Sequence, residues 1–257
     1  MDSCSQGGEG KKKITEVKTF PVPFSLGEIK ENIIINTDNL LNLSKEEIFN
    51  KAFMFQAEGN ILEAIKFYQL YFDRGFSDAI AFSNYGIILR KLGRLHEAEI
   101  FLYKAIKLKP NYAKAYSNLG NILRDLGKLK EAEISSRTAI ELNPKLAEAH
   151  SNLGGILKDL GKLKEAELSI REAIELNPKL AEAHCTLGTL LIELGNLEES
   201  ILCYEKAIDL DKNLDEAKAG MGRILLMTGQ LKEGVVKMRE AFGSINFNYK
   251  NSKIIIN

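Results

Sequence analysis

The sequence predicts an all-α fold, a right-handed α-solenoid of about six helix-turn-helix units. The first observation behind this prediction is that the stretch from Ser117 to Glu133 recurs almost unchanged from Ser151 to Glu167, 34 residues later. The second is that single residue types keep the same period along the chain. One such column comprises Gly86, Gly120, Gly154, Gly188 and Gly222. A fixed period of this length is typical of stacked repeats, in which each unit buries its apolar face against its neighbours.

Each unit is predicted to form two helices. In residues 113–146, apolar residues recur at helical spacing until Gly127, which ends the first helix. A second apolar stripe begins at Leu129, and Pro144 ends the helix that carries it. Gly120 lies inside the first helix, where glycine costs about 1 kcal/mol relative to alanine. We therefore expect the second helix to approach so closely at Gly120 that a Cβ would not fit.

The units follow one another in order along most of the chain. They span residues 45–78, 79–112, 113–146, 147–180, 181–214 and 215–248. A capping box from Ser44 to Glu47 predicts the start of the first helix. The outer two units depart from the columns, with Tyr71 and Met221 at positions that differ in the inner units. Such degenerate end units are common in solenoids.

Two segments lie outside the period. Residues 1–43 are expected to form an extended or disordered N-terminal arm, and residues 249–257 a C-terminal tail. Both segments carry the β-prone sequence IIIN, at Ile33–Asn36 and Ile254–Asn257. These stretches could add a strand to the sheet of a partner, or they could be flexible ends.

The bulk composition excludes several classes of partner. Lys and Arg together number 35, as do Asp and Glu, so no basic excess indicates nucleic acid. No apolar run reaches the roughly 20 residues that a membrane span needs, and no apolar segment follows the N-terminal lysines as in a signal peptide. The cysteines, Cys4, Cys185 and Cys203, lack metal-ligand spacing. We expect a cytoplasmic protein with free thiols and no metal or other cofactor.

These columns resemble the tetratricopeptide repeat family, over about four fifths of the chain. The family has an aromatic residue at the fourth position of its unit, followed by columns of glycine, alanine and proline. Units 113–146 and 147–180 match almost throughout, with Tyr116 and His150 at the aromatic position, whereas Lys212 replaces a proline in a later unit. The resemblance implies a stack of helix pairs whose concave face, lined by the first helix of each pair, binds a ligand.

The resemblance also implies that the sixth position of the unit faces this groove. That position holds Asn50, Asn84, Asn118 and Asn152 in the first four units, and Asn121 follows one helical turn after Asn118. A carboxamide both donates and accepts, so equally spaced amides can bind the backbone of an extended peptide. The column resembles the asparagine ladder of O-linked N-acetylglucosamine transferases, which holds substrate peptides. The alternative is that asparagine is a common family residue that suits an exposed helix.

Charged residues on the same face are candidate anchors for the peptide. Lys114 and Arg124 lie near the asparagine column, with Arg90 and Lys91 in the preceding unit, and carboxylates such as Glu182 follow later. The groove is therefore expected either to change from basic to acidic along its length or to be a solvated surface of mixed charge. The carboxylate clamp of chaperone-binding family members is not predicted, because its cations are missing here.

No catalytic motif is present in the sequence. His150 and His184 occupy the aromatic column of the repeat and are expected to be structural, and no phosphate-binding loop or metalloprotease motif occurs.

We expect a protein that is not an enzyme: a scaffold that holds an extended segment of a protein or peptide partner. The alternative is a substrate-recognition module of a glycosyl- or sulfotransferase system, since the chain has no room for a catalytic domain. A third hypothesis is self-association through end units, where Phe49, Phe53 and Phe55 are expected to be exposed.

Overall fold

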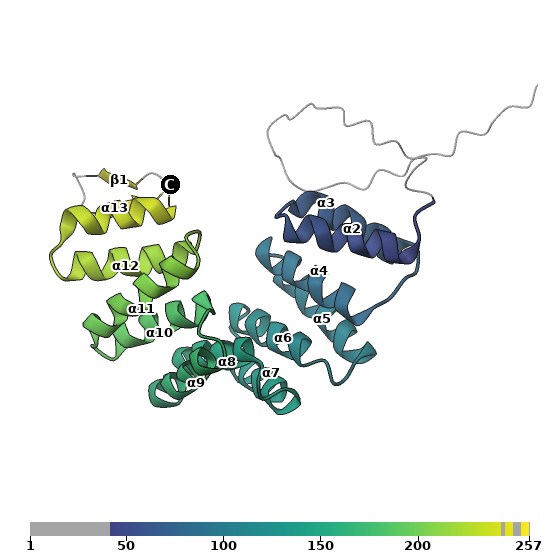
Figure 1. Ribbon diagram of the computed structural model, residues 1–257, viewed down its shortest axis with the longest axis horizontal. Helices are drawn as coiled ribbons and strands as arrows, with labels where there is room; N and C mark the ends of the chain where they lie inside the picture. The colour runs from purple at the N-terminus through teal and green to yellow at the C-terminus, as the bar shows by residue number, and fades with distance from the viewer. Residues whose placement is uncertain (1–41, 243–244, 249–252, 257) are drawn as a thin grey trace, which may run out of the picture. The chain divides into compact units, whose positions relative to one another are not determined.

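The computed structural model of this chain describes residues 42–242, 245–248 and 253–256. Within these residues, twelve α-helices follow one another and two short strands come after the last of them (Figure 1). The prediction of an all-α solenoid is confirmed, since the helices form consecutive packed pairs. The expected N-terminal arm, apart from its last two residues, lies outside the described residues.

Each unit contributes a first and a second helix. The first helices are α2 (Lys45–Ala57), α4 (Ala79–Lys91), α6 (Ala113–Asp125), α8 (Ala147–Asp159), α10 (Ala181–Glu193) and α12 (Asp215–Met227). The second helices are α3 (Ile61–Asp73), α5 (Leu95–Leu108), α7 (Leu129–Leu142), α9 (Leu163–Leu176), α11 (Leu197–Leu210) and α13 (Leu231–Phe242). A second helix packs against the first helix of its own unit and that of the next, and from α4 to α12 successive first helices also contact one another.

The turn between the helices of a unit depends on glycine. Gly127 has a φ of 75°, a left-handed conformation that costs a residue with a Cβ roughly 1–2 kcal/mol. Its N–H donates to the carbonyl oxygen of Arg124 at 2.9 Å, and the N–H of Lys128 donates to that of Leu123 at 2.8 Å. These bonds satisfy the last carbonyls of α6 and end the helix where the sequence predicts.

The two helices of a unit approach most closely at the second glycine column. A Cβ on Gly154 would lie 3.1 Å from the carbonyl oxygen of Ala166 and would overlap the side chain of Ile170. A Cβ on Gly120 would meet Ser136 and lie 3.4 Å from the carbonyl oxygen of Ala132. The expected close approach at this column is therefore confirmed.

Aromatic rings replace small residues between the first two units. Phe72 stacks on Phe82 with ring centroids 4.9 Å apart, and Phe101 meets Tyr85 edge-on at 4.8 Å. Tyr71, which stands where all five following units have alanine, is only 1% exposed. The first unit thus departs from the repeat pattern because aromatic rings fill its core.

The expectation of three exposed phenylalanines near the first unit holds for one of them. Phe49 packs against Tyr71 with centroids 6.0 Å apart, and Phe55 stacks on Phe67 at 5.4 Å. Phe53 alone of the three is strongly exposed, at 54%. Aromatic partners within the unit, which the repeat pattern does not contain, account for this difference.

Two strands follow the last helix. Strand β1 (Ile245–Asn248) pairs antiparallel with β2 (Lys253–Ile256), and Ile245 lies opposite Ile256. The β-prone residues Ile254 to Ile256 therefore pair within this chain, while Asn257 lies outside the described residues. The hairpin lies next to α13.

Candidate functional site

The asparagine column bridges successive first helices. The Nδ2 atom of Asn118 on α6 donates to the Oγ atom of Ser83 on α4 at 3.1 Å. One unit later, Nδ2 of Asn152 on α8 donates to Oγ of Ser117 on α6 at 2.9 Å. Both serines are buried. We call the side of the first helices that carries this column, continued by Thr186 and Gly220, the first-helix face.

The serine bonds orient the two amides. Since each Nδ2 is held by the preceding unit, the Oδ1 atoms of Asn118 and Asn152 are left as acceptors, and no hydrogen bond within the described part of the chain uses them. The sequence analysis missed these bonds. Their signal is a serine at the fifth position of the unit, 35 residues before each asparagine.

The other asparagines of the column are placed differently. Asn50 is exposed, and Asn121 is half-buried. Asn84 is half-buried, and its Nδ2 atom has no hydrogen-bond partner among the described residues. The physical reason is that Phe49, which has no hydroxyl, stands where the next three units have serine. Of the four asparagines at the sixth position, two therefore have the same hydrogen-bonded arrangement in the structure, Asn118 and Asn152.

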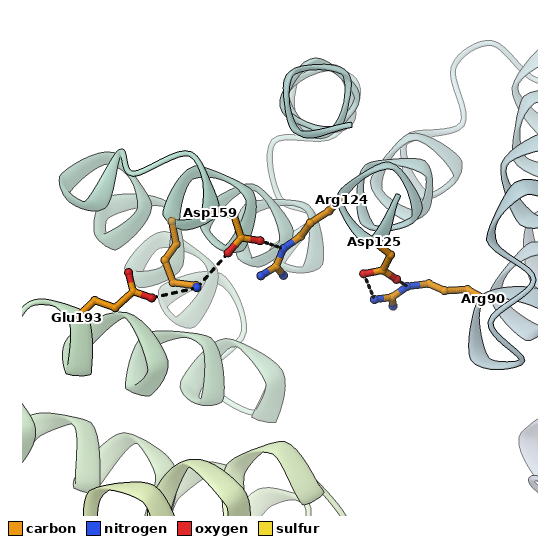
Figure 2. A network of polar contacts seen from close by, with 6 residues as sticks. Arg90, Arg124, Asp125, Asp159 and Glu193 are labelled. Atoms are coloured by element: carbon orange, nitrogen blue, oxygen red, sulfur yellow. Dashed lines mark hydrogen bonds and ion pairs between the residues drawn. The ribbon is translucent and has the colours of Figure 1, made fainter. Parts of the chain in front are cut away.

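Ion pairs connect the ends of the first helices in the same direction along the chain (Figure 2). Nε of Arg90 lies 2.6 Å from Oδ2 of Asp125, and Nε of Arg124 lies 2.5 Å from Oδ2 of Asp159. The last pair joins Nζ of Lys158 and Oε1 of Glu193 at 3.2 Å. In all three pairs the partners are 35 residues apart. At these positions cations and carboxylates are therefore paired across units and do not form separate basic and acidic stretches.

Arg124, a predicted anchor, lies across the next unit. A Cβ on Gly155 would come within 2.8 Å of its Nη1 atom, so the missing side chain of Gly155 gives the guanidinium room on α8. Lys114, the other predicted anchor, is exposed in the first turn of α6 and forms no ion pair among the residues that the structure describes. Of the two, Lys114 is the one whose charge is uncompensated.

The pairing at Asp159 affects its protonation. Burial alone would raise the pKa of Asp159, but hydrogen bonds from Arg124 and Lys158 outweigh that effect and hold the pKa below its ordinary value of 3.8. A carboxylate with a lowered pKa stabilises the fold at any pH above its unfolded-state pKa. That contribution is lost as the pH falls through the folded-state pKa.

We therefore expect the Asp159→Asn variant to show a pH-dependent deficit. At about pH 6 the variant should be less stable than the wild type, and the difference should be smaller at about pH 2, because the contribution of the charge declines as the pH falls toward and through the lowered pKa of Asp159. Urea unfolding followed by circular dichroism at both pH values measures this. A difference of equal size at both values would contradict the assigned role of the charge.

A cavity of about 500 Å³ lies near the C-terminal end of the first-helix face. The Tyr204 ring from α11 occupies the space that a Cβ on Gly220 would need, and its hydroxyl lies 2.9 Å from Oγ1 of Thr189. Arg223 and Phe242 also line the cavity. The sequence analysis missed it; its signal is the change from asparagine to Gly220 at the sixth position of the last unit.

Two histidines and two cysteines of the described residues have structural surroundings. Nε2 of His150 lies 2.9 Å from the carbonyl oxygen of Pro144, and Nε2 of His184 lies 3.0 Å from that of Pro178, which ties each ring to the turn before its helix. Burial raises the pKa of Cys185 to about 12 and that of Cys203 to about 11, so both remain thiols at neutral pH.

Within residues 42–242 and the two strands, no group of three or more histidine, cysteine, aspartate or glutamate residues could hold a metal ion. No helix there is long and apolar enough to cross a membrane.

Solved structures share this arrangement of helices. TTC0263, described as a thermophilic TPR protein in Thermus thermophilus, has a TM-score of 0.59 at 20% identity, covering 64% of this chain and 90% of that chain. A tetratricopeptide repeat protein from Parabacteroides merdae has a TM-score of 0.55 at 21% identity, covering 77% and 78%. Pseudomonas aeruginosa pilF has a TM-score of 0.55 at 20% identity, covering 65% and 77%. These likenesses show the fold.

Sequence comparison assigns the family. No curated protein matches this chain. Models of the tetratricopeptide repeat match residues 77–145, 147–180 and 181–214. They match the repeat itself and do not single out the repeats of O-linked N-acetylglucosamine transferases. The chain belongs to the tetratricopeptide repeat family.

Proposed function

We propose that this protein is a non-enzymatic, cytoplasmic scaffold that holds an extended segment of a protein partner along its first-helix face. Tetratricopeptide repeat proteins generally bind protein or peptide partners and are generally non-catalytic. The observation that carries the proposal is the arrangement of Asn118 and Asn152, which stand one unit apart in the same orientation with uncommitted Oδ1 atoms. Such atoms can accept hydrogen bonds from backbone N–H groups of an extended chain.

The asparagines alone would bind weakly. A net hydrogen bond contributes about 0.5–1.5 kcal/mol, so two contribute about 1–3 kcal/mol, which is less than millimolar affinity requires. The cavity near Tyr204 exposes the ring of Phe242, an aromatic surface on which a side chain of the partner can be buried. Buried anchors of this kind provide most of the energy at protein interfaces.

The second candidate is a substrate-recognition module that works with a glycosyl- or sulfotransferase on another chain. The resemblance of the asparagine column to that of O-linked N-acetylglucosamine transferases favours it. Both candidates use the same face, and they differ in the partner. A transferase among the captured proteins would support the second candidate.

Affinity capture with paired variants tests the proposed site. The Asn118→Ala/Asn152→Ala variant removes the amides, whereas Ser83→Ala/Ser117→Ala removes the hydroxyls to which they donate and keeps the amides, Asn152 retaining its bond to the backbone carbonyl oxygen of Ser117 at 3.4 Å. We expect the asparagine variant to lose partners that the wild type captures from a lysate of the source cells, and the serine variant to retain them. Mass spectrometry identifies the proteins, after circular dichroism has shown equal helix content.

The serine variant separates the two roles of the amides. Equal capture by wild type and asparagine variant would contradict the proposed site. Equal loss from both variants would show that the asparagines act only by joining the units, and would also contradict it.

A further inference from the structure

We propose that the partner segment is basic, and that its lysine and arginine residues lie along the last three units. This inference rests on the proposed function, and it names the chemistry of the partner. It depends on which charged groups and hydrogen-bonding atoms of the first-helix face already form ion pairs or hydrogen bonds within the chain, and which do not.

The cations near the ends of the first helices are engaged. Arg90, Arg124 and Lys158 each lie within 3.2 Å of a carboxylate oxygen of the following unit. An acidic partner would have to displace those carboxylates to reach them. Each new ion pair with the partner would replace an ion pair of similar strength within the chain. These cations therefore give an acidic segment little net affinity.

The amide donors of the column are engaged as well. The Nδ2 atoms of Asn118 and Asn152 each donate a hydrogen bond to a serine of the preceding unit, whereas their Oδ1 atoms accept none from the described residues. This part of the face therefore presents acceptors. The ligand groups that acceptors favour are hydrogen-bond donors such as backbone N–H, ammonium and guanidinium.

A column of uncompensated carboxylates runs beside these acceptors. Glu148, Glu182 and Glu216 occupy the second position of the last three units, and all three are exposed. None of them forms an ion pair within the part of the chain that the structure describes. Each stands four residues before the sixth position of its unit. Residues four apart lie on one face of a helix, so the column faces the same side as Asn152.

The balance of unpaired charge on these helices is negative. Across α8, α10 and α12, the cations are Lys158, Lys218 and Arg223, and the first two are paired with carboxylates. Arg223 is therefore the single unpaired cation of the three described helices, against three unpaired glutamates. A basic segment gains from this excess over the last three units.

The charge pattern also sets where the basic residues lie. The second position holds Glu46 in the first unit, then Ile80 and Lys114 in the second and third units, so a carboxylate in every successive unit begins only at Glu148. Lys114 repels a cation, whereas each exposed glutamate attracts one, and both effects weaken as salt screens them. The basic part of the partner therefore lies beyond Lys114, toward Glu216.

Selection from a random dodecapeptide library on the immobilised full chain tests this inference. The test variant is Glu148→Gln/Glu182→Gln/Glu216→Gln. The matched control, Glu141→Gln/Glu172→Gln/Glu198→Gln, removes the same charge from exposed, unpaired glutamates of the second helices. We expect wild type and control to enrich peptides of net positive charge, and the test variant to lose that enrichment.

A fluorescein-labelled peptide from the wild-type selection gives the magnitude. Its affinity, measured by fluorescence anisotropy at low salt, should fall at least about fivefold in the test variant and stay within about twofold in the control. Added salt should weaken binding to the wild type more than binding to the test variant.

The outcomes separate this inference from the function on which it rests. A library that yields no enriched peptide at all would contradict the scaffold function. Enriched peptides without a positive charge, or a positive charge that persists in the test variant, would overturn this inference and leave the scaffold function standing.

Discussion

Replacement of Gly154 by leucine is expected to lower the free energy of unfolding by about 3 kcal/mol or more. The reason is that α8 and α9 meet at this residue with no space for a side chain. Even a Cβ would overlap Ile170 and lie 3.1 Å from the carbonyl oxygen of Ala166. That oxygen belongs to the backbone of α9, so relief requires the two helices of the unit to separate.

The neighbouring glycine provides the control. A Cβ on Gly155 would meet the guanidinium of Arg124, which is the end of a flexible side chain and can move aside. We expect Gly155→Ala to change the free energy of unfolding by less than about 1 kcal/mol, because helix propensity offsets the altered ion pair. Urea unfolding followed by circular dichroism measures both variants. A similar stability for the two would contradict the packing role of Gly154.

Replacement of Tyr204 by alanine is expected to cost about 3–5 kcal/mol. Its side chain is 1% exposed, and its ring packs on two glycines of different units. Atom Cε1 lies 3.1 Å from where a Cβ on Gly188 would be, and the ring fills the space beside Gly220. Loss of the ring therefore opens a cavity inside the fifth unit and another between the fifth and sixth units.

This variant should also change which part unfolds first. Since the Tyr204 ring fills part of the contact between α12 and the preceding unit, we expect α12 and α13 to exchange their amide hydrogens faster than the inner helices. Tyr204→Phe is the matched control. It removes only the hydrogen bond with Thr189, and we expect it to cost about 1 kcal/mol. Uniform faster exchange along the whole chain would contradict a local role for the ring.

The helices could be predicted because the period constrains them in several independent columns. Gly127 marks the end of α6, because its left-handed conformation favours glycine. Gly120 and Gly154 mark where the two helices of a unit approach closely. These are properties of the backbone within one unit. They are the same wherever the unit occurs, so one sequence suffices to find them.

The candidate site could be predicted only in part, because its geometry depends on pairs of units. The asparagine column was visible, but its bonds to Ser83 and Ser117 required the offset between successive helices. The same offset pairs Arg124 with Asp159, whereas the sequence analysis treated the cations and carboxylates of this face as separate groups along the groove. A comparison of each charged residue with the residue 35 positions later would have found the pairs.

The ion pairs between units have a consequence for how such a chain changes length. The third and fourth units each carry a cation toward the unit that follows and a carboxylate toward the unit before, namely Arg124 and Asp125 in the third and Lys158 and Asp159 in the fourth. The two ends of each of these units are thus complementary to each other. Tandem duplication of one such unit inserts a copy of 34 residues. The cation of the copy can pair with the carboxylate of the following unit, and its carboxylate with the cation of the preceding unit, without any new substitution. An insertion that is not a whole number of units would break that match, so growth by whole units is the route that the charges permit.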